Sequence, residues 1–285
     1  MKVAEKILVI RHGALGDFCL ATGAMKAIRE QHPEAQITLL TQSFLAPLAR
    51  RLGWFEAIEI DNRSRSLSEI WRICRLIAGG GFDRVYDLQQ THRTQRTYRW
   101  IAGLMSGFSV VWARLTAVAK PDLSMVHGEH EHFGRLPQRY ALLIPGCSPA
   151  NPEKRWPAQN YRKLSKWLGE QGIVSVVLGT KAEQAEIEAI CAENPQAVNF
   201  MGKSELTDIP DLARGAEIVI GNDTGPTHMC RLAGAKTVLL LPGYSRHLVG
   251  EGEGLRALIA EWVGDLSLEV VVAAIIELLG ERKGE

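Results

Sequence analysis

The apolar positions of this chain form short runs that alternate with longer segments of helical spacing. Short runs rich in β-branched residues predict strands buried on both faces of a sheet. In the first half the predicted strands are residues 6–10, 36–40, 57–60 and 84–88. A helix of about 15 residues is predicted to follow the turn at residues 13–17 and to end at His32-Pro33. Further helices are predicted at residues 44–51 and 66–78.

The second half of the chain repeats this alternation. Its predicted strands are residues 141–144, 173–178, 217–220 and 237–241, and its predicted helices are residues 158–171, 182–192, 208–214 and 268–280. Strands separated by helices imply parallel β-α-β units with helices on both faces of each sheet. The pattern therefore predicts an α/β fold with two doubly wound domains.

Residues 120–137 interrupt the alternation with histidines, glycines and prolines, which indicates a linker. We therefore divide the chain into an N-terminal domain, residues 1–138, and a C-terminal domain, residues 139–285. His127, His130 and His132 lack the helical spacing and strand context of a zinc site, so we interpret them as polar linker residues. The sequence contains no other metal-binding signature, and we expect no bound metal.

Composition is that of a soluble globular protein, since 46% of the 285 residues are hydrophobic and 23% are charged. The formal net charge of +1 gives no general attraction to nucleic acid, so an anionic partner must meet a local patch. Five cysteines occur singly, which indicates reduced thiols in the cytosol. The apolar run in the first ten residues is too short for the core of a signal peptide, and no apolar run approaches the roughly 20 residues that cross a bilayer. We expect a cytoplasmic protein without a transmembrane segment.

The most informative stretch is a β-branched run that ends at Gly221 and continues into Asn222, Asp223 and Thr224. It predicts a strand, a tight turn and a helix. Such a corner places unpaired backbone N–H groups and the positive end of a helix dipole where an anion such as a diphosphate can bind. The polar side chains of the turn, with Thr227, suit sugar hydroxyls. The structural alternative is that Asp223 or Thr224 only caps the helix.

Two motifs carry a resemblance to a known family. Residues 221–228 read Gly-Asn-Asp-Thr-Gly-Pro-Thr-His, and residues 10–17 read Ile-Arg-His-Gly-Ala-Leu-Gly-Asp. Both resemble hallmarks of the glycosyltransferase family 9 heptosyltransferases of lipopolysaccharide core synthesis. The resemblance implies a GT-B fold, with two doubly wound Rossmann-like domains that face a cleft. It implies that the first domain binds the acceptor and the second the nucleotide sugar, with the final helix able to pack back on the first domain.

The resemblance also implies a reaction. A heptose or a related sugar is expected to pass from ADP-heptose to a lipopolysaccharide inner-core acceptor, with inversion and without a cofactor. Asp17 matches the family's general base, which takes the proton of the attacking hydroxyl. The alternative is that Asp17 is the N-cap of its helix. A glycolipid acceptor adds the expectation of peripheral attachment to the cytoplasmic face of the inner membrane.

Donor-binding candidates follow three strands of the second domain. Lys154, in a Lys-x-Trp-Pro element, is expected to stabilise the departing diphosphate, and Ser148 lies near enough in sequence to reach a phosphate. Glu183 stands where a family glutamate contacts the donor ribose. The alternative is that it only interacts with the helix dipole, since acidic residues are common in the first turn of a helix. The signature turn adds Asp223, Thr224, Gly225 and His228. We expect the histidine to orient the turn rather than to act as acid or base.

A basic rim is expected on the first domain, from arginines that follow two successive strands. Its members are Arg63, Arg65, Arg93 and Arg96, with Arg99 beside them. The planar guanidinium group suits acceptor phosphates or carboxylates. The alternative is that these arginines are ordinary solvated charges.

Two features depart from the family pattern. Gly23 stands where a proline often follows the first motif, and Leu-Pro-Gly-Tyr at residues 241–244 replaces a loop that usually contains phenylalanine and threonine. The second departure leaves the donor open, so a transferase of the same family with another donor is one alternative. A non-catalytic nucleotide-sugar-binding protein with the same shell is another. A dinucleotide-dependent oxidoreductase is disfavoured, because neither half opens with Gly-x-Gly-x-x-Gly.

Overall fold

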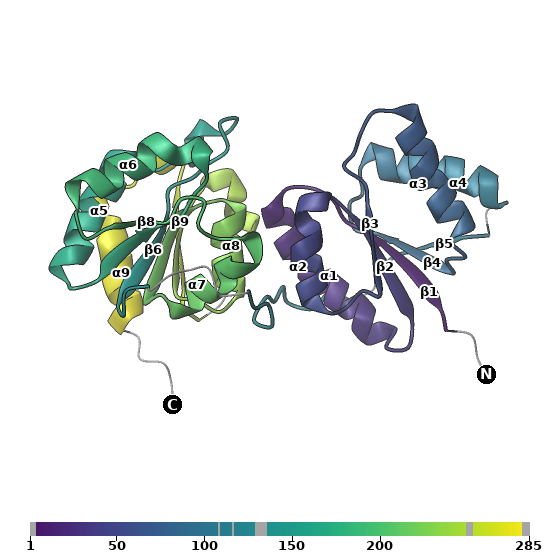
Figure 1. Cartoon of the computed structure of the whole chain (residues 1–285), viewed down its shortest axis with the longest axis horizontal. Coiled ribbons are helices and arrows are strands. Elements are labelled where there is room, and N and C mark those ends of the chain that lie inside the picture. The colour runs from purple at the N-terminus through teal and green to yellow at the C-terminus, as the bar shows by residue number, and fades with distance from the viewer. Residues whose placement is uncertain (1–3, 108, 116, 129–135, 249–252, 281–285) are drawn as a thin grey trace. The chain divides into compact units, whose positions relative to one another are not determined.

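The structure is a computed structural model that describes residues 4–107, 109–115, 117–128, 136–248 and 253–280. The chain divides into an N-terminal unit, Met1–Met125, and a C-terminal unit, Val126–Glu285. Each unit contains a parallel β-sheet with helices on both faces (Figure 1). The predicted α/β class with two doubly wound units is confirmed.

The N-terminal sheet has the strand order β3-β2-β1-β4-β5. Its strands are β1 (Lys6–Ile10), β2 (Gln36–Thr41), β3 (Ala57–Ile60), β4 (Arg84–Asp87) and β5 (Val111–Ala113). Central strand β1 runs parallel to both neighbours, so that Val9 pairs with Leu39 of β2 and with Tyr86 of β4. The apolar residues of β1 are fully buried, as a run without polar alternation predicts for a strand covered on both faces.

Helices of the N-terminal unit cover both faces of this sheet. They are α1 (Leu15–Gln31), α2 (Ala46–Leu52), α3 (Leu67–Gly79) and α4 (Arg99–Ser106), and a π-helical turn, Arg93–Tyr98, leads into α4. Helices α1 and α2 lie on one face, and α3 and α4 on the other (Figure 1). Ile73, Ile77 and Tyr98 pack against Leu8 and Val85 in the core on the second face. The basic stretch after β4 is helical from Arg93 onwards.

The C-terminal sheet has the strand order β11-β10-β9-β6-β7-β8. Its strands are β6 (Tyr140–Ile144), β7 (Val174–Val177), β8 (Val198–Asn199), β9 (Ile218–Asn222), β10 (Thr237–Pro242) and β11 (Leu255–Ala260). Its helices are α5 (Ala158–Glu170), α6 (Gln184–Glu193), α7 (Ile209–Gly215), α8 (Gly225–Leu232) and α9 (Leu268–Gly280). Helices α5, α6 and α9 lie on one face of the sheet, and α7 and α8 on the other (Figure 1).

The final helix, α9, packs within the C-terminal unit. Val271, Ile275 and Leu278 are fully buried in the same core cluster as Ile220 of β9 and Leu240 of β10. Their spacing of three and four residues forms one apolar stripe, which is what a helix on a sheet requires. The buried face of α9 therefore packs against the sheet of the C-terminal unit. The resemblance had allowed the final helix to pack on the first domain instead.

Each sheet contains a point where the strand order reverses. It lies between β1 and β4 in the N-terminal unit and between β6 and β9 in the C-terminal unit. Loops that leave neighbouring strands at such a point turn to opposite faces and open a crevice, where open α/β sheets bind ligands. One signature segment follows β1 and the other begins within β9. Both signature segments therefore lie at the switch point of their own sheet.

Candidate functional site

Asn222, the last residue of β9, ties the ends of two strands together. Its Oδ1 accepts hydrogen bonds from the Trp156 N–H at 3.1 Å and from the Tyr161 hydroxyl at 3.2 Å, and its Nδ2 donates to the Pro145 carbonyl at 2.8 Å. The side chain is fully buried. Its polar atoms are thus used inside the protein, so the interpretation of Asn222 as a group for sugar hydroxyls is wrong.

Asp223 lies at the centre of a chain of polar contacts at the start of α8. Its Oδ2 accepts from Lys154 Nζ at 2.7 Å, and its Oδ1 lies 2.8 Å from His228 Nε2. Arg231 Nε donates to His228 Nδ1 at 3.0 Å. Because Nδ1 accepts, the proton of a neutral imidazole is on Nε2, which then donates to Asp223. The structure brings Asp223, Lys154 and His228 together, and the histidine contacts the turn as expected.

The carboxyl group of Asp223 is held in its ionised form. Burial acts to raise its pKa, but hydrogen bonds from His228, Lys154 and Ser245 outweigh burial and hold the pKa well below its usual range. Only 2% of the side chain is exposed, so the charge is compensated by these partners rather than by water. Asp223 therefore fixes the position of the Lys154 ammonium group.

Lys154 reaches this position from a 3-10 turn, Pro152–Lys154, that follows β6. Its side chain is 19% exposed, and Nζ lies 5.6 Å from the ring centre of Tyr244. The Tyr244 hydroxyl donates to Glu153 Oε1 at 2.6 Å. An ammonium group has three donors, of which Asp223 takes one. Ser148, in the same loop, is exposed, and its hydroxyl accepts from the Ala150 N–H at 3.4 Å.

Glu183 caps a helical turn and also lies beside the loop after β6. Its Oε2 accepts from the Thr180 N–H at 2.9 Å and from the Thr180 hydroxyl at 2.7 Å, which completes a capping box. Its Oε1 lies 3.5 Å from the point that a Cβ on Gly146 would occupy. Glu183 therefore stabilises the start of a helical turn, as the structural alternative predicts. Its other carboxylate oxygen points toward the end of β6.

The N-terminus of α8 presents backbone N–H groups at the end of β9. Thr224 is the N-cap residue, and its hydroxyl lies 3.2 Å from that of Thr227. Gly225 is the first helical residue, and like Thr224 it is partly exposed. A Cβ on Gly221 would overlap the Thr227 hydroxyl and lie 3.0 Å from Ile144 Cβ, so only glycine fits where the helix meets the strand.

Asp17 is exposed in the first turn of α1, in the N-terminal unit. The N-cap of this helix is Ala14, and no side chain caps it. The N-cap interpretation of Asp17 is therefore wrong. Gly13 has φ +102°, a backbone conformation that favours glycine, and a Cβ there would make only an ordinary contact of 3.8 Å with Asp17 Oδ2. Asp17 is therefore an exposed carboxylate without a capping role at the switch point of the N-terminal sheet.

A second buried carboxylate, Asp61, joins the loops around Asp17. It follows β3, and its Oδ2 lies 3.1 Å from His12 Nε2 and accepts from the Tyr98 hydroxyl at 2.5 Å. Arg93 Nε donates to the Tyr98 hydroxyl at 2.6 Å. Burial acts to raise the pKa of Asp61, but hydrogen bonds from His12 and Tyr98 lower it to about 2. Three segments that follow β1, β3 and β4 thus meet at one ionised, fully buried carboxylate.

The four arginines of the predicted basic rim have different environments. Arg93 points inward, where its NH1 donates to the Arg63 carbonyl at 3.2 Å and its NH2 lies 3.7 Å from Asp61 Oδ1. The side chains of Arg63 and Arg65 are exposed in the loop after β3. Arg96 lines a large pocket of the N-terminal unit whose lining does not include the other three arginines. The structure therefore does not bring the four guanidinium groups to one pocket, because Arg93 is engaged in the Asp61 cluster.

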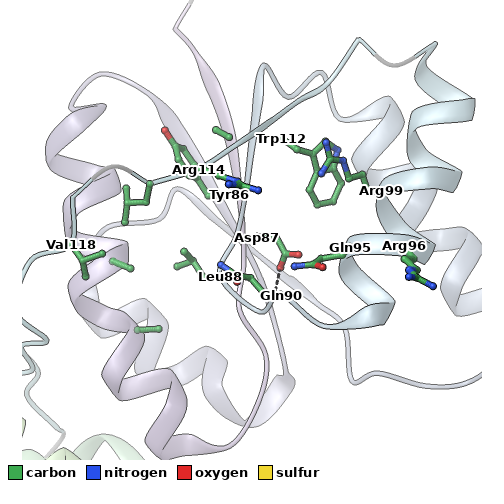
Figure 2. Close-up of a pocket in the computed structure, with 14 residues that line it drawn as sticks. Tyr86, Asp87, Leu88, Gln90, Gln95, Arg96, Arg99, Trp112, Arg114 and Val118 are labelled. Atoms are coloured by element: carbon green, nitrogen blue, oxygen red, sulfur yellow. Dashed lines mark hydrogen bonds between the residues drawn. The ribbon is translucent and has the colours of Figure 1, made fainter. Parts of the chain in front are cut away.

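That pocket has a volume of about 820 Å³ and lies at the carboxyl end of β4 (Figure 2). Asp87 and Gln95 line it together with three arginines, Arg96, Arg99 and Arg114. The guanidinium group of Arg99 lies 5.7 Å from the ring centre of Trp112, and Figure 2 shows the two side chains against each other. Arg114 and Trp112 are absent from the sequence-based candidates, because nothing near them in the sequence marks β5 as a pocket wall.

The predicted linker is only partly described. His127 Nδ1 lies 2.9 Å from Asp211 Oδ1, and the Gly128 N–H donates to Asp211 Oδ2 at 2.7 Å, so this end of the stretch is fixed on α7. His130 and His132 lie outside the described residues. Among the residues that are described, no three His, Cys, Asp or Glu side chains form a metal-binding group. Within the same part of the chain, every helix is too short or too polar to span a bilayer.

Comparison with known proteins identifies the family. The model of glycosyltransferase family 9 (heptosyltransferase) matches residues 88–241. Lipooligosaccharide heptosyltransferase 2 of Haemophilus ducreyi is 22% identical over 277 residues, which cover 79% of each protein. A family 9 glycosyltransferase structure from Veillonella parvula has a TM-score of 0.79 at 20% identity and covers 98% of both chains.

A second solved structure agrees with the first. ADP-heptose lps heptosyltransferase II of E. coli has a TM-score of 0.76 at 17% identity, covering 96% of this chain and 98% of its own. These likenesses show that the fold is of the GT-B class. Because the family model spans more than half of the chain, the protein belongs to glycosyltransferase family 9, the heptosyltransferases.

Proposed function

We propose that this glycosyltransferase moves a heptose from ADP-heptose to an inner-core acceptor of lipopolysaccharide, with inversion at the anomeric carbon. The observation that carries the proposal is the Lys154–Asp223 pair at the start of α8, at the switch point of the C-terminal sheet. The names of two relatives support the choice of substrates, since one is a lipooligosaccharide heptosyltransferase and the other an ADP-heptose heptosyltransferase.

The donor is assigned to the C-terminal unit because its switch point carries groups suited to a nucleotide diphosphate. Backbone N–H groups at the start of α8 and the ammonium group of Lys154 supply positive charge for the two phosphates. We assign Glu183, whose Oε1 lies beside Gly146, to a ribose hydroxyl of the donor. The ammonium group of Lys154 attracts the diphosphate most strongly in the transition state, when negative charge develops on the leaving oxygen. Lys154 therefore lowers the activation barrier of transfer and does not only bind the donor in its ground state.

Asp17 is assigned as the general base in the N-terminal unit. An acceptor hydroxyl oxygen attacks the anomeric carbon, its proton passes to the Asp17 carboxylate, and the bond from that carbon to the diphosphate oxygen breaks. A single displacement of this kind inverts the anomeric configuration. The positive charge needed by the leaving group comes from protein groups, and the proposal includes no metal ion or cofactor.

The acceptor is assigned to the pocket of Arg96, Arg99 and Arg114. Its three cationic groups suit the phosphates and carboxylates of an inner-core glycolipid. Such an acceptor is anchored in a membrane, so we place the reaction at the cytoplasmic face of the inner membrane.

Asp17→Asn tests this mechanism. Asparagine keeps the size and polarity of the side chain but cannot accept the proton, so kcat is expected to fall by roughly 10²–10⁴, with the melting temperature and ADP affinity unchanged. Glu30→Gln, an exposed acidic residue on the same helix, is the matched control and is expected to keep the parental kcat. Turnover of Asp17→Asn within about threefold of the parent would remove Asp17 from the mechanism.

The alternatives give different outcomes in the same assay. A non-catalytic nucleotide-sugar-binding protein would be stabilised by ADP against heat yet would transfer sugar to no acceptor. A family member with another donor would transfer sugar from a different nucleotide sugar and would still lose kcat in Asp17→Asn.

A further inference from the structure

One stretch of the N-terminal unit is strongly cationic, although the whole chain has a formal net charge of only +1. Residues 88–121 contain no aspartate or glutamate. The same residues contain five cationic side chains, namely Arg93, Arg96, Arg99, Arg114 and Lys120. Arg93 is engaged by the Asp61 cluster, whereas Arg96 and Arg99 are exposed. This local excess of positive charge is the kind of patch that an anionic partner requires.

Large apolar side chains are exposed next to these arginines. Helices α3 and α4 pack side by side and expose Leu67, Trp71, Trp100, Leu104 and Met105, which we call the α3–α4 face (Figure 1). Trp100 is 61% exposed and Leu104 69%, and their spacing of four places them on one side of α4. Leu67 and Trp71 have the same spacing on α3. Five large exposed apolar side chains on two helices that contact each other indicate an interaction surface.

The exposed charges around the α3–α4 face are mainly positive. Arg75 is exposed on α3, close in sequence to Trp71, and Arg96 and Arg99 lie just before Trp100. The acidic residue of α3, Glu69, is paired with Arg72 at 2.7 Å. A partner that covers this face must therefore be both apolar and anionic.

The α3–α4 face continues into the large pocket. A hollow of about 470 Å³ is lined by Trp100, Val110 and Trp112, and it shares Gln95, Arg99 and Trp112 with the 820 Å³ pocket. An object that covers Trp100 therefore lies at the edge of the site assigned to the acceptor.

We propose that the α3–α4 face docks on the surface of a bilayer that contains anionic lipids. Trp100, Leu104 and their neighbours enter the interfacial region, where tryptophan is favoured, and Arg75 contacts lipid phosphates. Arg96 and Arg99 add to the attraction of the anionic surface while they line the acceptor pocket. The proposal rests on the proposed function in one respect: docking brings the pocket to the level at which a glycolipid presents its sugars. A second copy of the chain fits this face less well, because a two-fold contact would bring the arginines of both copies together.

Sedimentation of the full chain with lipid vesicles tests the proposal. Vesicles of phosphatidylcholine with added phosphatidylglycerol are expected to bind the parent protein, and vesicles of phosphatidylcholine alone are expected to bind it much less. Binding to the anionic vesicles is expected to weaken as salt rises, because exposed charges are screened within ~10 Å at 0.1 M.

A double variant locates the surface. Trp100→Ser with Leu104→Ser removes two exposed apolar side chains outside the 820 Å³ pocket, and it is expected to bind the anionic vesicles about tenfold more weakly at an unchanged melting temperature. Trp262→Ser with Ile276→Ser, at similarly exposed positions of the C-terminal unit, is the matched control and is expected to bind like the parent. Equal losses in the two double variants would overturn the proposal, and so would equal binding of the parent to both kinds of vesicle.

Other outcomes separate this proposal from the proposed function. If light scattering shows a dimeric parent and a monomeric Trp100/Leu104 variant, the face joins two copies of the chain and the proposal fails. With a lipid-free acceptor the variant is expected to keep the parental kcat, and with an acceptor in vesicles it is expected to lose activity. If no acceptor is glycosylated even by the parent, the proposed function fails, while the vesicle assay still decides whether the face binds lipid.

Discussion

Both units contain a buried aspartate paired with a histidine at a strand end, but the pairs are used differently. In the N-terminal unit Asp61 lies 3.1 Å from His12, and in the C-terminal unit Asp223 lies 2.8 Å from His228. The two aspartates differ in the further group that each one binds besides its histidine. Asp61 binds the buried hydroxyl of Tyr98, whereas Asp223 binds an ammonium group that is partly exposed.

This comparison shows that an ionised, buried carboxylate is not by itself a sign of chemistry. Asp61 joins three loops and has no exposed surface, so it holds the scaffold in which Asp17 stands. Asp223 holds a cation at a surface that a ligand can reach. We therefore expect the exposure of this further group, rather than the lowered pKa that both carboxyl groups share, to distinguish a structural cluster from a substrate site.

The largest effect expected from the comparison is on Lys154. Lys154→Met removes the cation but keeps most of the side-chain volume, and kcat is expected to fall by roughly 10²–10³, the usual loss for one group that stabilises developing negative charge. Kinetics at saturating donor and acceptor provide the measurement. Lys181→Met, an exposed lysine after the next strand, is the matched control and is expected to keep the parental kcat. A small change in Lys154→Met, no larger than in the control, would place both clusters in the structural class.

Asp61→Asn tests the structural cluster through stability. Since the folded pKa of about 2 is below the ordinary value of 3.8, the ionised group stabilises the fold above pH 4, and this contribution is lost as pH falls from about 4 toward 2. The difference corresponds to about 2 kcal/mol of unfolding free energy at neutral pH. Asp61→Asn is expected to lose that amount and to unfold with less dependence on pH below 4, as measured by urea denaturation.

Asp265→Asn serves as the control for this experiment, because Asp265 is exposed. It is expected to keep the parental unfolding free energy and the parental acid profile. If Asp61→Asn behaves in the same way, the buried cluster is not what holds the three loops together.

The smallest effects are expected for two arginines of the predicted rim, and they differ in the property that changes. Arg96→Ala is expected to raise the acceptor KM about tenfold without a change in melting temperature, because it removes a cation from the pocket wall. Arg93→Ala is expected to lower the melting temperature, because Arg93 contacts Tyr98 and Asp61. Arg65→Ala, exposed in the loop after β3, is the control for both. The assignment is contradicted if Arg93→Ala changes only the acceptor KM.

Much of the fold could be predicted from local patterns. The bounds of β1, β3 and α9 agree with the sequence prediction at both ends. Each of these elements has a clear pattern of apolar residues that ends at a clear break in the sequence. The prediction missed β5, β8 and β11, and it missed α4. Strands β5 and β8 are too short for a period to be visible, and the basic residues of the π-helical turn obscure the start of α4.

The candidate site was predictable only where one motif contained its own partners. Asp223 and His228 are five residues apart, so the signature alone predicts that the two side chains lie close together. His12 and Asp61 belong to different β-α-β units, and nothing in the residues around Asp61 marks it as the centre of a cluster. The contacts of Arg93 with Tyr98 and Asp61 were not predicted for the same reason, since Asp61 lies elsewhere in the chain.

Gly23 has a consequence for how the chain leaves the N-terminal unit. A Cβ at this position would overlap the carbonyl group of Ala119, so only glycine allows the outgoing segment to lie directly on α1. The Asp122 N–H then donates to the Thr22 hydroxyl at 3.2 Å. Gly23 thus allows the outgoing chain to pack against α1. A larger residue at position 23 is therefore expected to push this segment away from the helix whose first turn carries Asp17.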